Sequence, residues 1–258
     1  MNPEFTWFQY QSILLIVIRI TAMIAAAPFL GDKRIPVIAK VGLGCFAALI
    51  MLPLIEFLPS SHKTAPGFIY AALREGMVGL SIGFLAKLLF VGVQFSGQFV
   101  SLQMGFAMAQ LFNPATENNV PVLGEFYYIV AILIYLAIGG HGFLFDAIAQ
   151  SFNVVPLGEL AFQDEFFRVF TELTSEVFVI ALKIAAPVFV SILIIDLSLG
   201  LVARLVPQMN VFIFGFPLKI SVGILIIAFG LPIFGTLFIA IYESSKANIV
   251  TMIQLMAP

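Results

Sequence analysis

Charged residues interrupt nearly every long apolar stretch of this chain. They lie within segments otherwise long enough to cross a bilayer: Arg19 in 7–30, Lys40 in 35–58, Lys87 in 76–105, Lys183 and Asp196 in 177–206, and Lys219 in 211–242. A charge at bilayer depth costs from ~3 to more than ~10 kcal/mol, so such residues usually face protein or water. The pattern predicts helices that are covered in part by other protein, within a larger membrane assembly.

The composition is that of a membrane protein. Apolar residues make up 61% of the 258 positions and charged residues 10%, whereas soluble domains are about 45–50% apolar and about 25% charged. The mean hydropathy is +1.10. The net charge of −2 and the lack of a basic run argue against nucleic acid as a partner. The single cysteine, Cys45, lies in an apolar run and is predicted to be a small core residue.

The apolar stretches predict an all-α, membrane-associated fold with long, kinked helices in hairpins. A spanning helix needs ~20 apolar residues, and six segments qualify: about 7–29, 37–58, 68–112, 122–138, 166–206 and 217–242. The third is unusually long, and we expect a break at Gly92 or Gly97. Residues 160–178 alternate aromatic and charged residues at helical spacing, which predicts a water-exposed amphipathic start to the fifth segment. Asp164 and Arg168 stand four residues apart there, in the order that favours a helical ion pair.

The chain carries no recognisable catalytic or metal-binding motif. His62 and His141 are far apart in sequence, and neither has a ligand-forming companion at helical spacing. His141 belongs to the run Gly139–Gly142, which predicts a turn at the end of the fourth segment. The N-terminus lacks the positive region of a secretory signal, so we expect it to remain in the mature protein. We therefore expect no enzymatic activity, no cofactor and no metal site.

Small residues recur every four positions on the third segment. They are Gly97, Ser101, Gly105 and Ala109. Such a strip lets two helix backbones approach closely, which is how membrane helices associate. The partner helix belongs either to another subunit or to this chain; the sequence leaves both open.

A run of turn-forming and polar residues follows this segment. It comprises Phe112, Asn113, Pro114, Ala115, Thr116, Glu117, Asn118, Asn119 and Val120. Irregular backbone at membrane depth is tolerated only where it is buried in protein or lines a wet cavity. The residues alone leave open whether this loop is a gate or an ordinary surface connection.

Several short motifs together resemble one known family. They are Leu102–Gly105 leading to Asn113–Pro114 and Pro121–Leu123, Gly139–His141, Val155–Gly158, Leu199–Leu201, Arg204, Pro207–Gln208, Asn210, Phe212 and Gly215–Leu218. Each motif alone is weak, but the set is similar to the FliR family of flagellar type III export-gate proteins, and the resemblance covers essentially the whole chain.

The resemblance implies a single export-gate domain in the bacterial inner membrane, at the flagellar basal body. Residues 1–165 would form a portion like the P-type subunit, and 166–258 a hairpin like the Q-type subunit. The implied partners are P-type and Q-type subunits, the B-type switch subunit, membrane lipid and exported unfolded polypeptides, with much of the chain raised toward the periplasm. Loop 112–120 would plug the channel, with Met104, Phe106 and Met108 as constriction residues.

The function expected from this resemblance is a gated channel for unfolded flagellar proteins. Arg204 and Lys219 are expected to pair with partner carboxylates or helix ends. One alternative is the equivalent T subunit of a virulence secretion system. Another is a small-solute transporter that uses the intramembrane charges as its pathway, and a third is a scaffold that nucleates the assembly without lining the pore.

Overall fold

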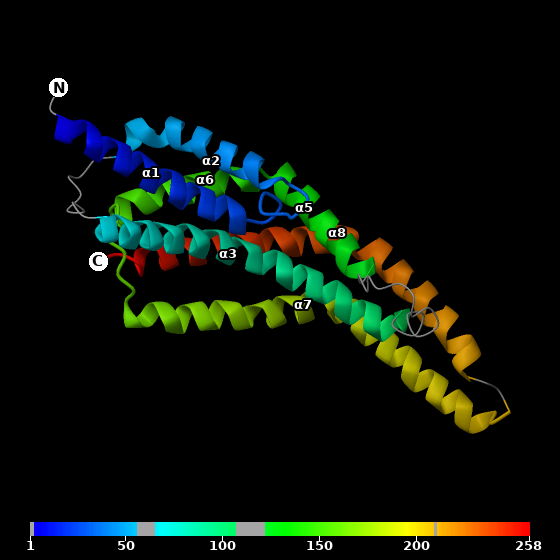
Figure 1. Ribbon diagram of the computed structural model, residues 1–258. Coiled ribbons are helices and arrows are strands. Elements are labelled where there is room, and N and C mark those ends of the chain that lie inside the picture. The colour runs from blue at the N-terminus through cyan, green and yellow to red at the C-terminus, as the bar shows by residue number, and fades with distance from the viewer. Residues whose placement is uncertain (1–2, 56–64, 107–121, 209–210) are drawn as a thin grey trace. The chain divides into compact units, whose positions relative to one another are not determined.

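The computed structural model describes residues 3–55, 65–106, 122–208 and 211–258, and these residues form helices without any strand (Figure 1). The elements are α1 (Pro3–Ala26), α2 (Val37–Met51), the 3-10 turn η1 (Leu52–Leu54), α3 (Ala65–Met104), α5 (Val122–Ala137), α6 (Gly140–Val154), α7 (Asp164–Leu205) and α8 (Val211–Gln254). The predicted all-α fold is confirmed.

The chain divides into two compact units. Unit 1 comprises Met1–Leu88, Tyr135–Thr174 and Glu243–Pro258, and unit 2 comprises Leu89–Ile134 and Ser175–Tyr242. Helices α3, α7 and α8 therefore contribute residues to both units. This division by packing cuts across the predicted boundary at residue 165. The predicted boundary separates a portion that resembles a P-type subunit from a hairpin that resembles a Q-type subunit, and it stays a prediction.

The longest predicted helix is continuous, so the expected break at Gly92 or Gly97 is wrong. Both glycines are buried in α3. A Cβ at Gly92 would lie 2.9 Å from Ile180 Cγ2, and one at Gly97 would lie 2.5 Å from Gly124 Cα. A glycine costs a helix about 1 kcal/mol relative to alanine. Close packing against α7 and α5 offsets that cost.

Two further helix boundaries differ from the prediction. Helix α6 was not predicted; it starts after Gly139, whose φ of 69° allows the chain to bend by 69° between α5 and α6. His141 thus lies in the first turn of a helix. Helix α8 runs twelve residues past Tyr242 to Gln254 and includes the ion pair between Lys246 Nζ and Glu243 Oε2 at 2.6 Å.

Unit 1 is assembled by close helix contacts through glycine. A Cβ on Gly79 would overlap the Arg19 carbonyl of α1, and one on Gly83 would overlap the Met23 carbonyl. Both glycines of this GxxxG pair therefore let α3 lie against α1. Helix α2 packs on α1; Gly44, Ala47, Ala48 and Met51 are buried, and the opposite side of α2 is left exposed by the described residues. Cys45 lies on that exposed side, so its predicted core position is wrong.

A buried ion pair lies at the centre of unit 1. Arg19 on α1 is fully buried, and its Nε and Nη2 donate to the two oxygens of Glu75 on α3, at 2.5 and 2.9 Å. Its Nη1 donates to the carbonyl and hydroxyl oxygens of Ser151, and Nη2 also donates to the Val155 carbonyl. The guanidinium lies 4.3 Å from the Phe152 ring centroid. All five donors of Arg19 are used, so the charge is covered by protein, as its position in an apolar stretch predicts.

The amphipathic start of α7 is confirmed. Phe166 and Val177 are buried, whereas Glu165, Arg168 and Glu172 are exposed. Phe170 stacks with Phe84 of α3 at a centroid distance of 5.6 Å. Arg168 pairs with Glu165 at 2.5 Å instead of with Asp164. Spacings of three and four residues both bring helical side chains together, and here the shorter one is used.

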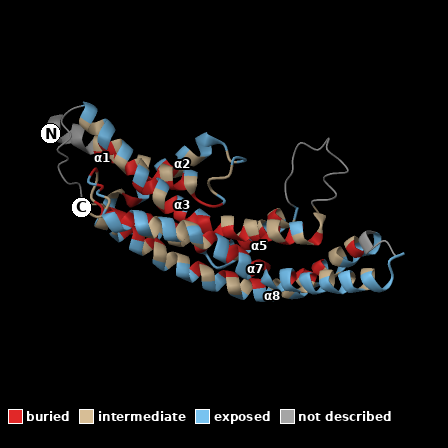
Figure 2. Cartoon of the chain, turned by 90° about the horizontal axis from the view of Figure 1, so that it is seen from below, coloured by how far each residue is buried: buried red, intermediate tan, exposed pale blue. Residues whose placement is uncertain are grey.

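By length and composition, three of the described helices could cross a membrane: α3, α7 and Ile213–Gln254 of α8. The bent pair α5 and α6 makes a fourth if it counts as one span. The most apolar 18-residue window is 61% buried in α3, but only 33% in α7 and 17% in α8. Figure 2 shows exposed residues along both α7 and α8. The described residues therefore leave much of the apolar surface of α7 and α8 uncovered.

Candidate functional site

The predicted small-residue strip meets a helix of the same chain at Gly97. In unit 2, Gly97 of α3 lies against Leu123 and Gly124 of α5. A Cβ on Gly97 would lie 2.5 Å from both the Leu123 carbonyl oxygen and Gly124 Cα. Ser101, one turn later, is also buried. The sequence left open whether the partner helix belongs to another subunit or to this chain. In the described residues, Gly97 contacts a helix of this chain.

The strip does not continue as a helical face through Gly105. Helix α3 ends at Met104, and Gly105 has a φ of 85°, in the left-handed region that favours glycine. A Cβ there would also lie 2.7 Å from Phe216 Cδ1 of α8. A glycine just past a helix end is a common stop signal, and the spacing argument overlooked it. Ala109, the last residue of the strip, lies outside the described residues.

Met104 is fully buried and fills the space beside Gly223 of α8. A Cβ on Gly223 would lie 2.5 Å from Met104 Cε, so any larger residue there would require the Met104 side chain to move. Phe106 is half-buried. Among the predicted constriction residues, Met104 thus fixes the end of α3 against α8. Met108 and the whole plug loop 112–120 lie outside the described residues.

Aromatic rings join the helices of unit 2. Phe90 of α3 makes edge contacts with Tyr128 of α5 and Phe238 of α8, with centroids 6.1 and 5.8 Å apart. Tyr127 of α5 meets Phe234 of α8 at 5.2 Å. Such edge-to-face pairs contribute about 0.5–1.5 kcal/mol each beyond their buried area. They hold α3, α5 and α8 together.

The α7–α8 hairpin carries an ion pair between Lys219 and Asp196. The two side chains are 19% and 40% exposed. Lys219, predicted to pair between subunits, therefore has a carboxylate partner within its own chain. Arg204 lies exposed in the last turn of α7, where a positive charge interacts favourably with the helix dipole.

These features define a class of protein: an all-helical membrane protein with charged pairs inside apolar helices and two helices that remain largely uncovered. Within the described ranges, no three His, Cys, Asp or Glu side chains come together in a group that could hold a metal ion. The contacts of this site are packing contacts, and they fix α3, α5 and α8 against one another.

The chain belongs to the family described as Bacterial export proteins, family 1, which matches residues 10–245. It is similar to three proteins that are each named flagellar biosynthetic protein FliR. The relative from Bacillus subtilis is 34% identical over 96% of this chain and 95% of its own length. Those from Aquifex aeolicus and Escherichia coli are 32% and 31% identical, over 86% and 84% of this chain and 86% and 83% of their own lengths. The resemblance predicted from the motifs is confirmed, and none of these names describes a catalytic activity.

Proposed function

We propose that this protein is a subunit of the flagellar type III export gate in the bacterial inner membrane. With P-type and Q-type subunits it forms a gated channel for unfolded flagellar proteins, and the B-type switch subunit binds the same assembly. The observation that carries the proposal is the small buried share of α7 and α8, at 33% and 17% of their most apolar windows. Because these helices also hold Asp196, Arg204 and Lys219, lipid alone is a poor cover for them.

The gate is the loop 112–120, which lies within the segment between the end of α3 at Met104 and the start of α5 at Val122. The described residues before and after this segment are held in unit 2, by the Gly105–Phe216 contact and by the Gly97–Gly124 contact. A loop between fixed ends can take a seated, leak-tight position or be displaced by a passing polypeptide. Phe106 and Met108 are the constriction residues in this proposal, since aromatic rings and flexible thioethers adapt to varied sequences.

Within this gate the protein is not an enzyme. Export is driven by partner proteins or by the proton gradient, and this chain contributes the channel wall and its closure. Much of the chain lies raised toward the periplasm within the complex, where sister subunits cover the exposed apolar surface of α7 and α8.

Copurification tests the assembly. Full-length chain with an affinity tag is purified from flagellated cells in mild detergent, and its companions are identified by mass spectrometry. P-type and Q-type subunits are expected in stoichiometric amounts. A chain that is stable, active in motility and free of both subunits would overturn the proposal.

A deletion tests the plug. Removal of Pro114–Val120 is expected to raise ion leakage through the inner membrane of cells that make the whole complex. The control is a variant in which the same seven residues are replaced by seven glycines and serines, which keeps the connection but not the side chains. If the deletion variant assembles normally and leaks no more than the wild type, the loop is not the plug.

Two observations speak against a small-solute transporter. All five N–H groups of Arg19 donate hydrogen bonds to Glu75, Ser151 and Val155 inside unit 1. Lys219 is paired with Asp196. These charges are engaged in structure instead of lining a pathway. Relatives named for flagellar biosynthesis favour the flagellar role over the virulence one, and restoration of motility in a strain that lacks its own gate subunit distinguishes the two.

A further inference from the structure

One uncovered face of α3 is polar, although the helix around it is apolar. Lys87, Val91, Gln94, Gln98 and Leu102 follow one another at spacings of four, three, four and four residues, so they lie along one face of the helix. Lys87 and Leu102 are exposed, and the other three are half-buried. We call this the amide face; from Lys87 to Gln98 it is ~16 Å long, at ~1.5 Å per residue.

The polar groups of the amide face have no partner among the described residues. No hydrogen bond or ion pair in these ranges joins the Lys87 ammonium group, or the amides of Gln94 and Gln98, to another residue. By contrast, the exposed hydroxyls of Ser191 and Ser198 on α7 each donate to a carbonyl of their own helix, at 2.8 Å. An amide or ammonium group that faced hydrocarbon would stay without partners, which is costly. The amide face therefore needs water or other polar groups beside it.

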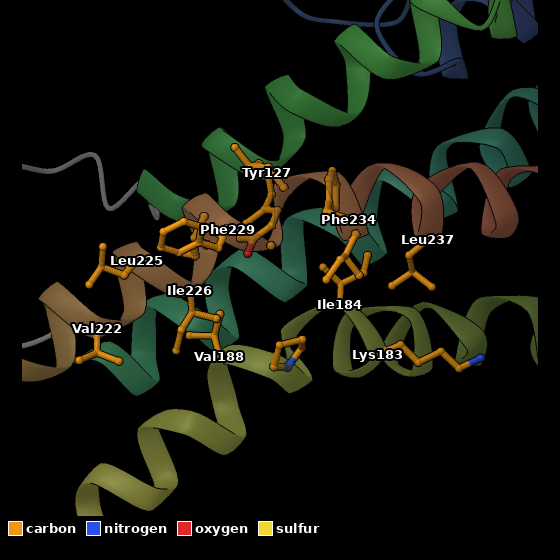
Figure 3. A pocket seen from close by; sticks show the side chains of 15 residues that line it. Tyr127, Lys183, Ile184, Val188, Val222, Leu225, Ile226, Phe229, Phe234 and Leu237 are labelled. Carbon is orange, nitrogen blue, oxygen red and sulfur yellow. The ribbon is translucent and has the colours of Figure 1, made fainter.

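The uncovered surface of α7 and α8 in unit 2 has a different character. A pocket of about 340 Å³ between α5, α7 and α8 has Tyr127 and Lys183 as the only polar side chains among its described lining residues (Figure 3). Its other lining residues are apolar, for example Val188, Leu225 and Phe229. Such a surface suits the apolar helices of partner subunits, as proposed above. The amide face and this pocket therefore require different neighbours.

The amide face leads along α3 toward the segment assigned above as the plug. Helix α3 ends at Met104, six residues after Gln98, and loop 112–120 follows before α5 begins at Val122. A plug closes a channel only where the channel passes, so the helix that precedes the plug runs beside the lumen. Polar residues within spanning helices usually face the interior of a bundle or a water-filled cavity, and they mark substrate paths.

We propose that the amide face of α3 lines the lumen of the export channel and contacts the exported polypeptide. The inference rests on the proposed function and names the part of this chain that touches the substrate. An unfolded polypeptide offers backbone N–H and carbonyl groups whatever its sequence, and a glutamine amide both donates and accepts hydrogen bonds. Gln94 and Gln98 thus exchange hydrogen bonds with any passing segment, while Lys87 attracts its acidic side chains.

Site-specific photo-crosslinking in cells tests the contact. A benzophenone amino acid replaces Gln94 or Gln98 in the full-length chain within a complete export apparatus, and export is stalled by an exported protein fused to a stably folded domain. The controls carry the same replacement at Leu197 of α7 or Leu225 of α8, which are exposed apolar positions. Positions 94 and 98 are expected to crosslink to the stalled substrate, whereas the control positions crosslink to partner subunits only.

Variants test whether the amides themselves matter for export. Gln94→Leu/Gln98→Leu removes both amides and is expected to lower secretion of flagellar proteins about tenfold, the order expected for two lost hydrogen bonds, while P-type and Q-type subunits still copurify. Gln94→Asn/Gln98→Asn retains the amides and is expected to keep most of the secretion. Val91→Leu, on the same face, is the matched control and leaves secretion unchanged. Wild-type secretion by the double leucine variant would refute the role of the amides.

The crosslinking results separate this inference from the export-gate function. Crosslinks from positions 94 and 98 to a partner subunit, and none to the substrate, would make the amides interhelical contacts and overturn the inference. Crosslinks to the substrate from positions 197 or 225 alone, with P-type and Q-type subunits still copurifying, would also overturn it but leave the export-gate function standing. A chain that copurifies with neither subunit and crosslinks to no substrate would refute both.

Discussion

Replacement of Arg19 by methionine tests whether the buried ion pair holds unit 1 together. The change removes five hydrogen bonds and leaves the Glu75 carboxylate, 1% exposed, with the Gly158 N–H donating to its Oε1 at 2.7 Å. Loss of one partner of a buried pair costs about 3–5 kcal/mol. At ~2–4 °C per kcal/mol for a chain of this size, the melting temperature should fall by roughly 6–20 °C.

The assay is thermal unfolding of the purified full-length chain in detergent, followed by the loss of its monodisperse peak in size-exclusion chromatography. Arg168→Met is the control, since Arg168 and Glu165 form an exposed pair whose contribution is about 0–1 kcal/mol. The double variant Arg19→Met/Glu75→Leu should lose less than Arg19→Met alone, because no charge is then left buried. The reasoning is refuted if the double variant loses the sum of both single variants, or if Arg19→Met matches the control.

Three further changes follow from the close contacts. Gly105→Ala should lower the melting temperature more than Gly139→Ala. Alanine at a positive φ costs about 1–2 kcal/mol at either position, but only at Gly105 would its Cβ also crowd a neighbouring side chain. Equal shifts would contradict the contact with α8. Gly97→Ala should cost about 1–3 kcal/mol by overpacking against α5, and no measurable loss in the same assay would argue against that contact. A double-mutant cycle on Asp196→Asn and Lys219→Gln should give a coupling of at most about 1 kcal/mol, since the pair is partly exposed; a much larger value would show a drier environment.

The helical architecture was predictable because apolar length and Pro or Gly boundaries report directly on spanning helices. Helix α6 was missed because its fifteen residues include Asp146, Gln150 and Asn153 and so contain no long apolar run. The end of α8 was missed for the same reason: Glu243 and Lys246 read as a boundary, although an ion pair at three-residue spacing fits within a helix.

The site was predictable only in part. Intramembrane charge implied that Arg19 is covered by protein, but nothing in the sequence identifies Glu75, 56 residues away, as its partner. Hydropathy likewise placed Cys45 inside an apolar helix without indicating which side of that helix faces outward. The small-residue spacing predicted a close helix contact at Gly97, whereas the end of α3 at Gly105 depends on a backbone dihedral that spacing does not encode.

The Arg19–Glu75 pair constrains the order in which the nascent chain settles. A ribosome adds the intervening 56 residues in roughly 3–11 s, at ~5–20 residues per second. During that interval the guanidinium of Arg19 lacks Glu75, its partner in the folded chain. The packing that buries Arg19 of α1 must therefore wait for synthesis of α3, so these two helices reach their final arrangement together.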